Sequence, residues 1–429
     1  FEYFIWITHV SEPILSSSGC KYSEGNIMIE LSNWLHVKEA FRSKHLRQAG
    51  YTEGAIVMEG TLLDLHGLEH RERRRLENRL FRREIFSYWE HEILGETIDA
   101  TMKPFVEKGS GDLAQIGYRC AMNLTATIAG IDQDPRNEDQ TELMYSMVKK
   151  FSEGATIMHS TRDKDEVRAE VKKAMESFHQ DFFLASKNRR EELLSDFERG
   201  KISEDELPRD VFTTLLRNAE TLNLDEDVVF REICFYLQAG AHSTANAFTH
   251  TVDDLFSWGE QHPADLERAR NDLPFVQRCM HESLRLSPAS PVALRTPLED
   301  VELSDGTLLP MGSHVVLNLI DANRDPEIFG NSASIFDPHR EVPDGVARWG
   351  MSFGAGSHAC VGAELDGGLE IDESRPSEEA LYGTVSVMVH ALLSAGGRKD
   401  EKNPPELDLN SERKHFSKYP VVFTAERDG

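Results

Sequence analysis

The stretch Phe353-Gly354-Ala355-Gly356-Ser357-His358-Ala359-Cys360-Val361-Gly362 places one cysteine among three glycines near the end of the chain. Glycine has no side chain, so it lets the backbone turn tightly and approach a ligand closely. A cysteine in such a loop can lose its proton to a metal and remain a thiolate. The pattern therefore predicts a loop that lays bare backbone against a flat cofactor and offers its metal a thiolate ligand. A glycine-rich turn around a buried free cysteine is the alternative, and two motifs upstream argue against it.

The cysteine pattern indicates a reduced protein. Five cysteines are scattered along the chain and form no CxxC pair: Cys20, Cys120, Cys234, Cys279 and Cys360. Such spacing argues against a disulfide framework and against a structural zinc site, and no CxxCH sequence is present for covalent haem attachment. We therefore expect a cytoplasmic protein.

Length and charge narrow the class of protein. The chain has 429 residues, 39% of them hydrophobic, and no Pro/Gly/Ser-rich linker, so a single domain over residues 1–429 is expected. A net charge of −27 argues against nucleic acid or an anionic membrane as a partner. The apolar run at residues 1–7 is far shorter than the roughly 20 residues that cross a bilayer, so we expect no membrane span.

One segment of this acidic chain is basic. Residues 71–83 carry seven arginines: Arg71, Arg73, Arg74, Arg75, Arg79, Arg82 and Arg83. A basic face of this kind can dock an acidic partner. The alternative is a solvated helix face whose arginines pair with Glu69, Glu72 and Glu77.

The apolar periodicity predicts a mainly α chain of α+β class, rich in helices and with small β-sheets. From about 64 to 270 apolar residues recur at spacings of three and four, with polar connectors or frayed helix ends at 130–140 and 187–210. A long helix is expected from about 225 to 260, beginning in an acidic turn and stopping before Pro263. Two further helices are expected, at 272–286 and 377–395. Strands are expected at 292–296 and 314–319, on either side of a turn at 304–306, and also at 26–31 and 419–423.

A second motif is Glu282-Ser283-Leu284-Arg285. Residues three apart share a helix face, so Glu282 and Arg285 can pair, although most such pairs are surface decoration. Arg340 in the downstream run Phe336-Asp337-Pro338-His339-Arg340 would close a three-membered ion network with them. A buried network fixes geometry and cannot lose one member cheaply.

A third motif lies in the long helix, at Ala239-Gly240-Ala241-His242-Ser243-Thr244. A helical glycine costs about 1 kcal/mol relative to alanine, so Gly240 needs a reason. A ligand lying against the backbone is one reason, and close packing of two helices is the other. Ser and Thr can bend a helix by bonding the carbonyl four residues back, which suits a floor for a small molecule such as O2.

The order AGxxx(S/T), ExxR, FxPxR and FGxGxHxCxG resembles the cytochrome P450 superfamily of haem-thiolate monooxygenases, over about residues 64–365. The resemblance implies haem b as cofactor, O2 as co-substrate and Cys360 as the iron ligand, whose thiolate favours O–O cleavage. Phe353 would pack near the sulfur, and Gly354 and Gly362 would bring backbone close to the haem. His358 would meet a haem propionate.

The resemblance also implies propionate contacts upstream. His70 and Arg74 form an HxxxR pair on one helix face, and Arg295 follows the ExxR helix. His70 has an alternative role as an ordinary surface histidine. Three residues would be structural and hold the proximal side: Glu282, Arg285 and Arg340. Six residues would line the distal pocket and suit a hydrophobic ligand: Leu237, Ala239, Gly240, Ser290, Val292 and Ala293.

The chain also departs from the family pattern. Family members commonly place an acid before the distal threonine, where this chain has His242 and Ser243 followed by Thr244. Histidine titrates near neutrality and can relay protons, or it can point away from the haem. An acidic, glycine-bearing insertion at 366–377 follows the cysteine loop and is expected near the proximal face, where it would shape docking of a redox partner. Residues 1–60 match the family poorly.

These features predict a monooxygenase that inserts one oxygen atom of O2 into a hydrophobic small molecule. Electrons would come from NAD(P)H through a reductase and a ferredoxin- or flavodoxin-type partner, since no GxGxxG sequence lies between a strand and a helix. Two alternatives remain open, a haem-thiolate sensor without turnover and a peroxide-driven haem enzyme.

Overall fold

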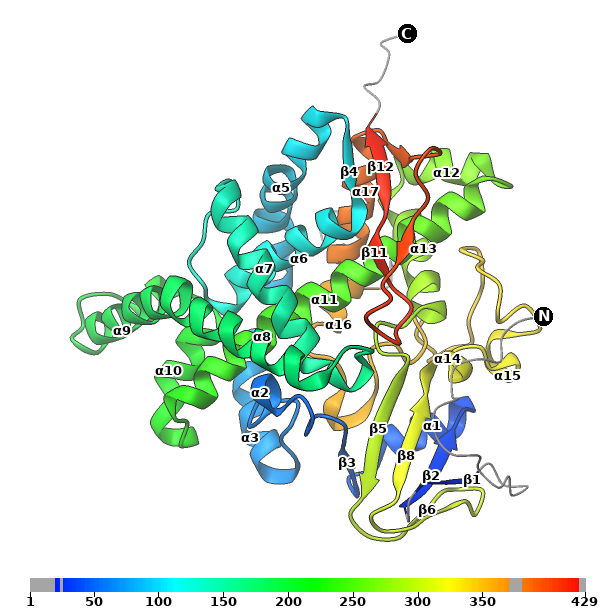
Figure 1. Ribbon diagram of the computed structural model, residues 1–429, viewed down its shortest axis with the longest axis horizontal. Coiled ribbons are helices and arrows are strands. Elements are labelled where there is room, and N and C mark those ends of the chain that lie inside the picture. Colours follow the sequence, from blue (N-terminus) through cyan, green and yellow to red (C-terminus); the bar gives the residue numbers. More distant parts are fainter. Residues whose placement is uncertain (1–19, 24–25, 370–379, 424–429) are drawn as a thin grey trace.

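The computed structural model describes residues 20–23, 26–369 and 380–423 (Figure 1). Its longer helices are α1 (Trp34–Arg42), α3 (Gly67–Glu77), α5 (Gly95–Lys108), α6 (Leu113–Ala129), α7 (Glu138–Ala155), α8 (Lys164–Phe178), α9 (Leu184–Glu198), α10 (Val211–Leu222), α11 (Glu226–Gly259), α13 (Leu273–Leu286) and α17 (Thr384–Ser394). The shorter ones are α2 (Ala55–Met58), α4 (Arg83–Tyr88), α12 (Pro263–Ala269), α14 (Leu319–Ala322), α15 (Pro326–Phe329) and α16 (Ala363–Gly367). The prediction of a helix-rich chain with small sheets is confirmed.

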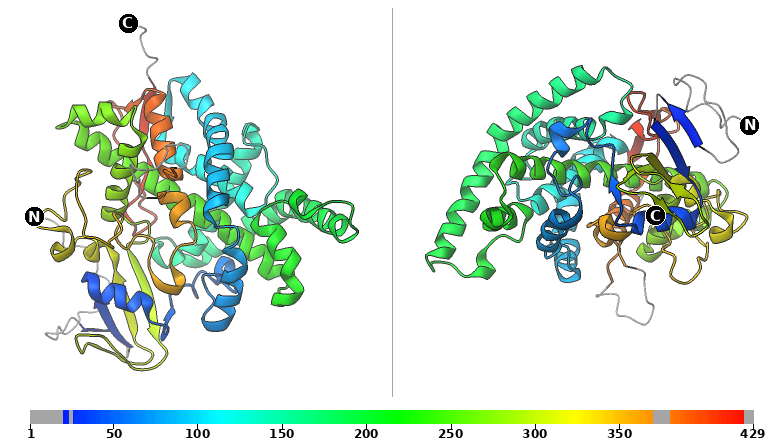
Figure 2. Two further views of the ribbon diagram at one scale, coloured as in Figure 1. Left: turned by 180° about the vertical axis from the view of Figure 1, so that it is seen from behind. Right: turned by 90° about the horizontal axis from the view of Figure 1, so that it is seen from below.

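The strands are short and form one larger and three smaller sheets in the described residues. They are β1 (Cys20–Ser23), β2 (Asn26–Leu31), β3 (Leu46–Gln48), β4 (Ser110–Asp112), β5 (Val292–Pro297), β6 (Val301–Glu302), β7 (Leu308–Leu309), β8 (His314–Asn318), β9 (Gly397–Lys399), β10 (Glu406–Leu407), β11 (Phe416–Lys418) and β12 (Pro420–Phe423). The largest sheet has the order β1-β2-β8-β5-β3, in which only the β2–β8 pair is parallel. Figures 1 and 2 place this sheet on the opposite side of the molecule from α9 and α10.

The long helix α11 runs through the centre of the molecule, beside α6 and α7 (Figure 1). Asp225 caps it by accepting a hydrogen bond from the Val228 backbone, and two acids in its first turn suit the positive end of the helix dipole. Its extent agrees with the predicted 225–260. α6 packs so closely on it that a Cβ at Gly240 would lie 2.4 Å from Thr125 Oγ1. Close packing of helices is therefore one reason for Gly240.

The five-stranded sheet has its own small core. β8 alternates between exposed and buried positions, and its inward side chains Val315 and Leu317 join Trp34, Val37 and Phe41 of α1 in one cluster. Alternation with a period of two is what a sheet covered by a helix on one face requires. β5 pairs antiparallel with β8, with Ala293 opposite Leu317. This pairing places the residues around 290–295 at the edge of the central cavity.

Two expected elements have different limits in the structure. The polar segment 187–210 is helical as far as Glu198, because α9 runs to that residue. The last helix begins at Thr384 and not at 377, since Gly383 adopts a φ of 86° that helical residues do not take. Residues 370–379, which include most of the 366–377 insertion, and residues 1–7 lie outside the described part of the chain.

The arginine-rich segment is not one helix face. α3 ends at Glu77 and α4 begins at Arg83. Arg73 is buried and forms an ion pair with Glu232 at 2.7 Å, while Glu77 beside it is also buried. The exposed arginines of the segment are Arg71, Arg75, Arg79, Arg82 and Arg83. In the described residues, none of the helices is both long and apolar enough to cross a bilayer.

Candidate functional site

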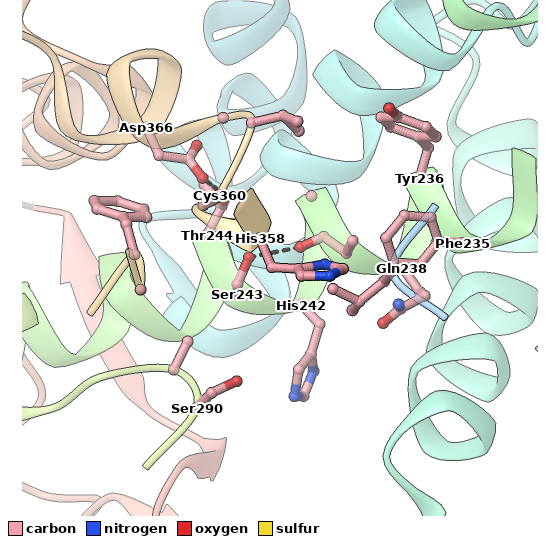
Figure 3. A pocket seen from close by; sticks show the side chains of 18 of the residues that line it. Phe235, Tyr236, Gln238, His242, Ser243, Thr244, Ser290, His358, Cys360 and Asp366 are labelled. Carbon is pink, nitrogen blue, oxygen red and sulfur yellow. Dashed lines mark hydrogen bonds between the residues drawn. The ribbon is translucent and has the colours of Figure 1, made fainter. Parts of the chain in front are cut away.

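A cavity of about 370 Å³ lies where α3, α6, α11 and the loop 353–362 meet (Figure 3). Its walls are mainly hydrophobic, with aromatic side chains among them. Most of the residues singled out by the sequence line it, although they come from segments more than 200 positions apart. The fold therefore gathers the predicted site into one place.

The cysteine loop forms one wall of this cavity. The Cys360 backbone N–H donates to the Phe353 carbonyl oxygen at 2.9 Å and closes the loop. Gly356 has a φ of 72°, and a Cβ there would lie 2.3 Å from the Phe41 carbonyl oxygen, so only glycine fits. Among the cysteines whose side chains are described, Cys360 alone is exposed, and it opens onto the cavity inside the fold.

The thiol of Cys360 is tuned by its surroundings. Burial within the fold raises its pKa to about 11, with the nearby Asp366 carboxyl adding to the rise. The Gly362 backbone N–H and the Arg74 guanidinium oppose that rise. The free thiol therefore keeps its proton at neutral pH, and a bound metal cation would have to replace that proton.

Basic side chains gather beside the cysteine loop. The rings of His70 and His358 lie 3.9 Å apart, and Arg74 donates to the Ala359 carbonyl oxygen at 2.6 Å. Gln48 joins the cluster, since it contacts His358 Nδ1 at 3.0 Å and accepts from Arg295 at 2.8 Å. The cluster thus joins the cysteine loop and α3 to β3 and β5.

The charge of this basic cluster rests on its arginines. Burial lowers the pKa of His70 to about 4 and that of His358 to about 3, with neighbouring cationic groups adding to both shifts. Burial also lowers the pKa of Arg295, but only to about 10, so this guanidinium stays charged. His70 is buried, and its Nε2 atom has no hydrogen-bond partner. It is therefore not a surface histidine, and its free nitrogen faces a site that could accept an anionic group.

The distal helix contributes two hydroxyls with different partners. Ser243 Oγ donates to the Ala239 carbonyl oxygen four residues back at 2.5 Å. Thr244 Oγ1 instead donates across the cavity wall to Asp366 Oδ2 at 3.0 Å. Asp366 lies in α16, six residues after Cys360, and burial raises its pKa to about 7. Thr244 therefore contacts a carboxyl group that can carry a proton near neutral pH.

His242 lines the cavity but faces away from that pair. Its ring points to the side opposite Cys360 and Asp366 (Figure 3). It lies edge-on to His415 at 5.3 Å and is within 3.3 Å of Asn246. Burial and the nearby Arg413 hold its pKa well below the usual range. The structure thus favours the alternative in which His242 points away from the cofactor side.

The sequence does not identify Asp366 as a site residue. It does indicate that the acidic residue common in the family before the distal threonine is absent here, where His242 stands. The pattern groups Asp366 with the insertion 366–377, whereas Asp366 and Gly367 belong to α16. Gln277 of α13 donates to the carbonyl oxygens of Gly367 and Leu381 on either side of the undescribed residues. The one available signal was an acid six residues after the cysteine.

Four of the six predicted lining residues do line the cavity: Ala239, Gly240, Ser290 and Ala293. Leu237 does not, because it lies two residues before Ala239 on the far side of the helix and is fully buried in the core. Val292 does not either, because neighbouring residues of a strand point to opposite faces and Ala293 takes the cavity side. Leu237 and Val292 thus lie outside the wall of this cavity.

The ion network behind the loop is compact. Arg285 forms two bonds to Glu282, at 2.7 and 2.8 Å, and Arg340 donates to the same carboxylate at 3.0 Å. All three side chains are buried, and Arg285 also donates to the Asn323 and Ala333 carbonyl oxygens. The network therefore ties α13 to the loops that precede the cysteine segment.

Known proteins resemble this chain in sequence and in fold. The family model described as Cytochrome P450 matches residues 259–365. Cytochrome P450 monooxygenase PikC of Streptomyces venezuelae is 32% identical over 173 residues, which cover 40% of this chain and 38% of the relative. The biotin biosynthesis cytochrome P450 of Bacillus subtilis is 30% identical over 157 residues, 37% of either chain. The matches thus span less than two fifths of the length of these relatives.

Solved structures extend the likeness in fold to almost the whole chain. The structure of P450BioI with an acyl carrier protein ligated to hexadec-9Z-enoic acid has a TM-score of 0.69 at 20% identity, over 94% of this chain and 93% of that one. Epothilone B-bound cytochrome P450epoK has a TM-score of 0.70 at 15% identity, over 95% and 94% of the two chains. At such identities the comparison speaks for the fold alone.

Proposed function

Because the chain belongs to the cytochrome P450 superfamily, we propose that it is a haem-thiolate monooxygenase acting on a hydrophobic small molecule. The observation that carries the proposal is the position of Cys360, whose thiol opens onto an apolar cavity beside a cluster of basic side chains. Such a pairing suits a flat apolar cofactor that carries an iron and two carboxylates. The enzyme would use O2 as co-substrate.

The donor set fits haem b. Cys360 would hold the iron, and Arg74, Arg295, His70 and His358 would hold the propionates, with the unpartnered His70 Nε2 as a free hydrogen-bonding atom. Phe353 lines the cavity beside the thiol. When bound, haem with a thiolate ligand supplies the activation of O2. Every other part of the reaction depends on what the chain's own residues bind, orient and protonate.

Proton handling is assigned to the Thr244–Asp366 pair and not to His242. Asp366 has a pKa of about 7, so it can hold a proton or release it near neutral pH. Thr244 Oγ1 is its hydrogen-bond partner and lines the cavity, so a proton can pass between the two groups. Ser243 also lines the cavity as the alternative hydroxyl. This acid supports turnover over a sensor role, because the sensor alternative rested on the missing acid at 242.

Electrons are assigned to separate redox proteins. The proposed supply is NAD(P)H through a reductase and a ferredoxin- or flavodoxin-type carrier. Five exposed arginines lie at positions 71, 75, 79, 82 and 83 of an otherwise acidic protein, and their charge suits an acidic carrier. A cytoplasmic location is part of the same proposal.

The test is the absorption spectrum of the reduced protein with carbon monoxide. We expect a strongly red-shifted Soret band, the mark of a thiolate ligand, in the wild-type protein. Cys360→Ser should abolish that band, whereas Cys120→Ala, which changes a buried cysteine of α6, should keep it. A Soret band typical of imidazole- or thiol-ligated haem in the wild type would refute the proposal. Substrate-dependent NAD(P)H consumption with product formation would then separate an oxygenase from a sensor.

A further inference from the structure

A half-buried arginine lines the cavity on the side away from the cysteine loop. Arg413 lies in the connection between β10 and β11, and it lines the cavity together with Ala289 and Ser290. Its Nη1 atom reaches the Ala289 carbonyl oxygen only at 3.4 Å, and its Nε atom is buried without a partner. The guanidinium group thus keeps at least one unused donor, and its side chain lines the cavity.

No carboxylate of the described residues pairs with this guanidinium. The two nearest acids along its own connection are engaged elsewhere, since Asp408 contacts His415 at 3.3 Å and Glu412 lies 3.9 Å from His159. Among the described residues, Tyr51 is the one group whose charge would favour the protonated arginine, and it stays neutral because burial raises its pKa. Within the described part of the chain, Arg413 is therefore a half-buried cation without a carboxylate counter-ion.

Such an arrangement is expensive for a protein. An ion that is partly withdrawn from water and has no partner loses solvation free energy, and arginine cannot avoid this loss by giving up its proton near neutral pH. In an apolar pocket, a single charged side chain that points at the ligand commonly fixes the ligand's orientation. The missing counter-ion is therefore expected from a bound molecule.

Arg413 is separate from the basic cluster assigned to the propionates. The cationic groups that act on His358 are His70, Arg295, His66 and Arg74, and Arg413 is not among them. Arg413 acts instead on His242 and His159. Figure 3 places His242 and Ser290 on the side of the cavity opposite Asp366 and Cys360. The two groups of cations thus act on different histidines, although Arg295 and Arg413 both act on Tyr51.

The backbone around Arg413 is held in place before any ligand binds. Thr161 donates through its backbone and hydroxyl groups to the Asn410 and Leu409 carbonyl oxygens, at 3.1 and 2.8 Å. The Glu412 backbone N–H donates to the His159 carbonyl oxygen at 2.8 Å. Contacts on both sides of the connection fix the arginine over the segment between α7 and α8. A preorganised guanidinium suits two parallel bonds to a planar anion.

We propose that Arg413 binds the carboxylate of the substrate, so that this enzyme acts on an apolar organic acid held with its apolar end toward Cys360. The assignment rests on the monooxygenase function proposed above and narrows its substrate class. Arg413 is a specificity-determining residue in this scheme. Neutral molecules of the same shape bind more weakly, because they leave the guanidinium unpaired.

The experiment measures binding to the holoprotein by calorimetry and by the spin-state shift of the haem. The probes are dodecanoate and 4-phenylbutanoate, each beside its neutral amide. We expect the wild type to bind at least one acid ten-fold or more tightly than its amide. Arg413→Gln should lose that preference, Arg413→Lys should keep part of it, and Arg209→Gln, which removes an exposed charge, should keep all of it.

The outcomes separate the two proposals. A wild type that shows the thiolate Soret band but no preference for either acid over its amide overturns the inference and leaves the proposed function standing. A variant at 413 that loses haem while keeping the preference for the acid also overturns it, since the arginine would then serve the cofactor. Absence of the thiolate band in the wild type refutes the proposed function itself.

Discussion

Asp254 illustrates what burial does to a single carboxyl group. It accepts a hydrogen bond from Ser283 Oγ at 2.6 Å across the contact between α11 and α13. Burial raises its pKa to about 7, and the nearby Asp253 and Glu282 carboxylates add to the rise. In the unfolded chain the same group titrates near pH ~3.9. The folded state therefore prefers the protonated form, so stability from this group is present in acid and is lost as the pH rises from about 4 to 7.

Asp254→Asn should remove this dependence. The amide keeps an oxygen that can accept from Ser283 but carries no charge at any pH. Relative to the wild type, the variant should gain about 3 kcal/mol in the free energy of unfolding between pH 5 and pH 8. Urea titrations at both pH values measure the gain, with Asp99→Asn, an exposed site on α5, as the control. An equal offset between variant and wild type at both pH values would contradict the prediction.

Some residues of the site could be predicted from the sequence and others could not. The residues of the cysteine loop were predictable because glycine and cysteine carry their chemistry locally. Asp366 and Arg413 were not, because an acid or an arginine has meaning only through its neighbours. Asp366 becomes a site residue by facing Thr244, which is 122 positions away. Arg413 is proposed as one because it pairs with no carboxylate among the described residues, which no local pattern can reveal.

Gly240 links the residue scale to the packing of elements. A Cβ at this position would meet Thr125 Oγ1 at 2.4 Å and Cγ2 at 2.8 Å, on the facing helix α6. Overpacking of this kind costs about 1–3 kcal/mol, while the better helix propensity of alanine returns about 1 kcal/mol. A Cβ at Gly95, at the start of α5, would meet nothing within 4 Å. The two glycines thus separate packing from propensity.

Gly240→Ala should therefore destabilise the protein by up to about 2 kcal/mol, whereas Gly95→Ala should be neutral or mildly stabilising. Thermal or urea unfolding measures both changes. The double variant Gly240→Ala/Thr125→Ala should recover most of the loss, because it removes the atoms that the new methyl group meets. Failure of this rescue would mean that the cost arises elsewhere than at the contact of α6 with α11.

At the scale of helices and strands, the predicted limits agree with the structure where one apolar periodicity continues over a long segment. α11 and α13 were expected within a residue or two of their limits because capping acids and prolines mark their ends. The interior of α9 was missed because this helix carries polar side chains on almost all of its sides. Its sequence therefore shows no helical periodicity of apolar residues. The start of α17 was missed because it depends on Gly383, where φ is 86° and an added Cβ would lie 2.4 Å from the Asp366 carbonyl oxygen.

At the scale of the whole molecule, distant parts of the chain are joined. β12 pairs with β4 on one side and with β9 on the other, so a strand at 420–423 lies beside one at 110–112. The Tyr419 hydroxyl donates to Asp253 of α11 at 2.8 Å. These contacts attach the C-terminal strands to the helical part. A single domain over the full length remains a prediction.

Charge is the other property that belongs to the whole molecule. The chain carries 74 acidic and 47 basic side chains, a net charge of −27. Such an excess repels itself in the compact state, and salt shortens the range of that repulsion from about 30 Å at 0.01 M to about 10 Å at 0.1 M. Surface ion pairs act in the opposite sense, because salt weakens them, but each contributes only about 0–1 kcal/mol.

Repulsion should outweigh the ion pairs here, because the acidic excess is large and most ion pairs lie at the surface. We therefore expect the free energy of unfolding at pH 7.5 to rise by about 1 kcal/mol or more when NaCl increases from 0.02 to 0.3 M. At about pH 5.5, closer to the sequence pI of about 5.0, the same salt step should have a smaller effect. Urea titrations at the four conditions measure the difference. If salt lowers stability at pH 7.5, ion pairs such as Arg162–Glu170 outweigh the net charge, and the repulsion argument fails.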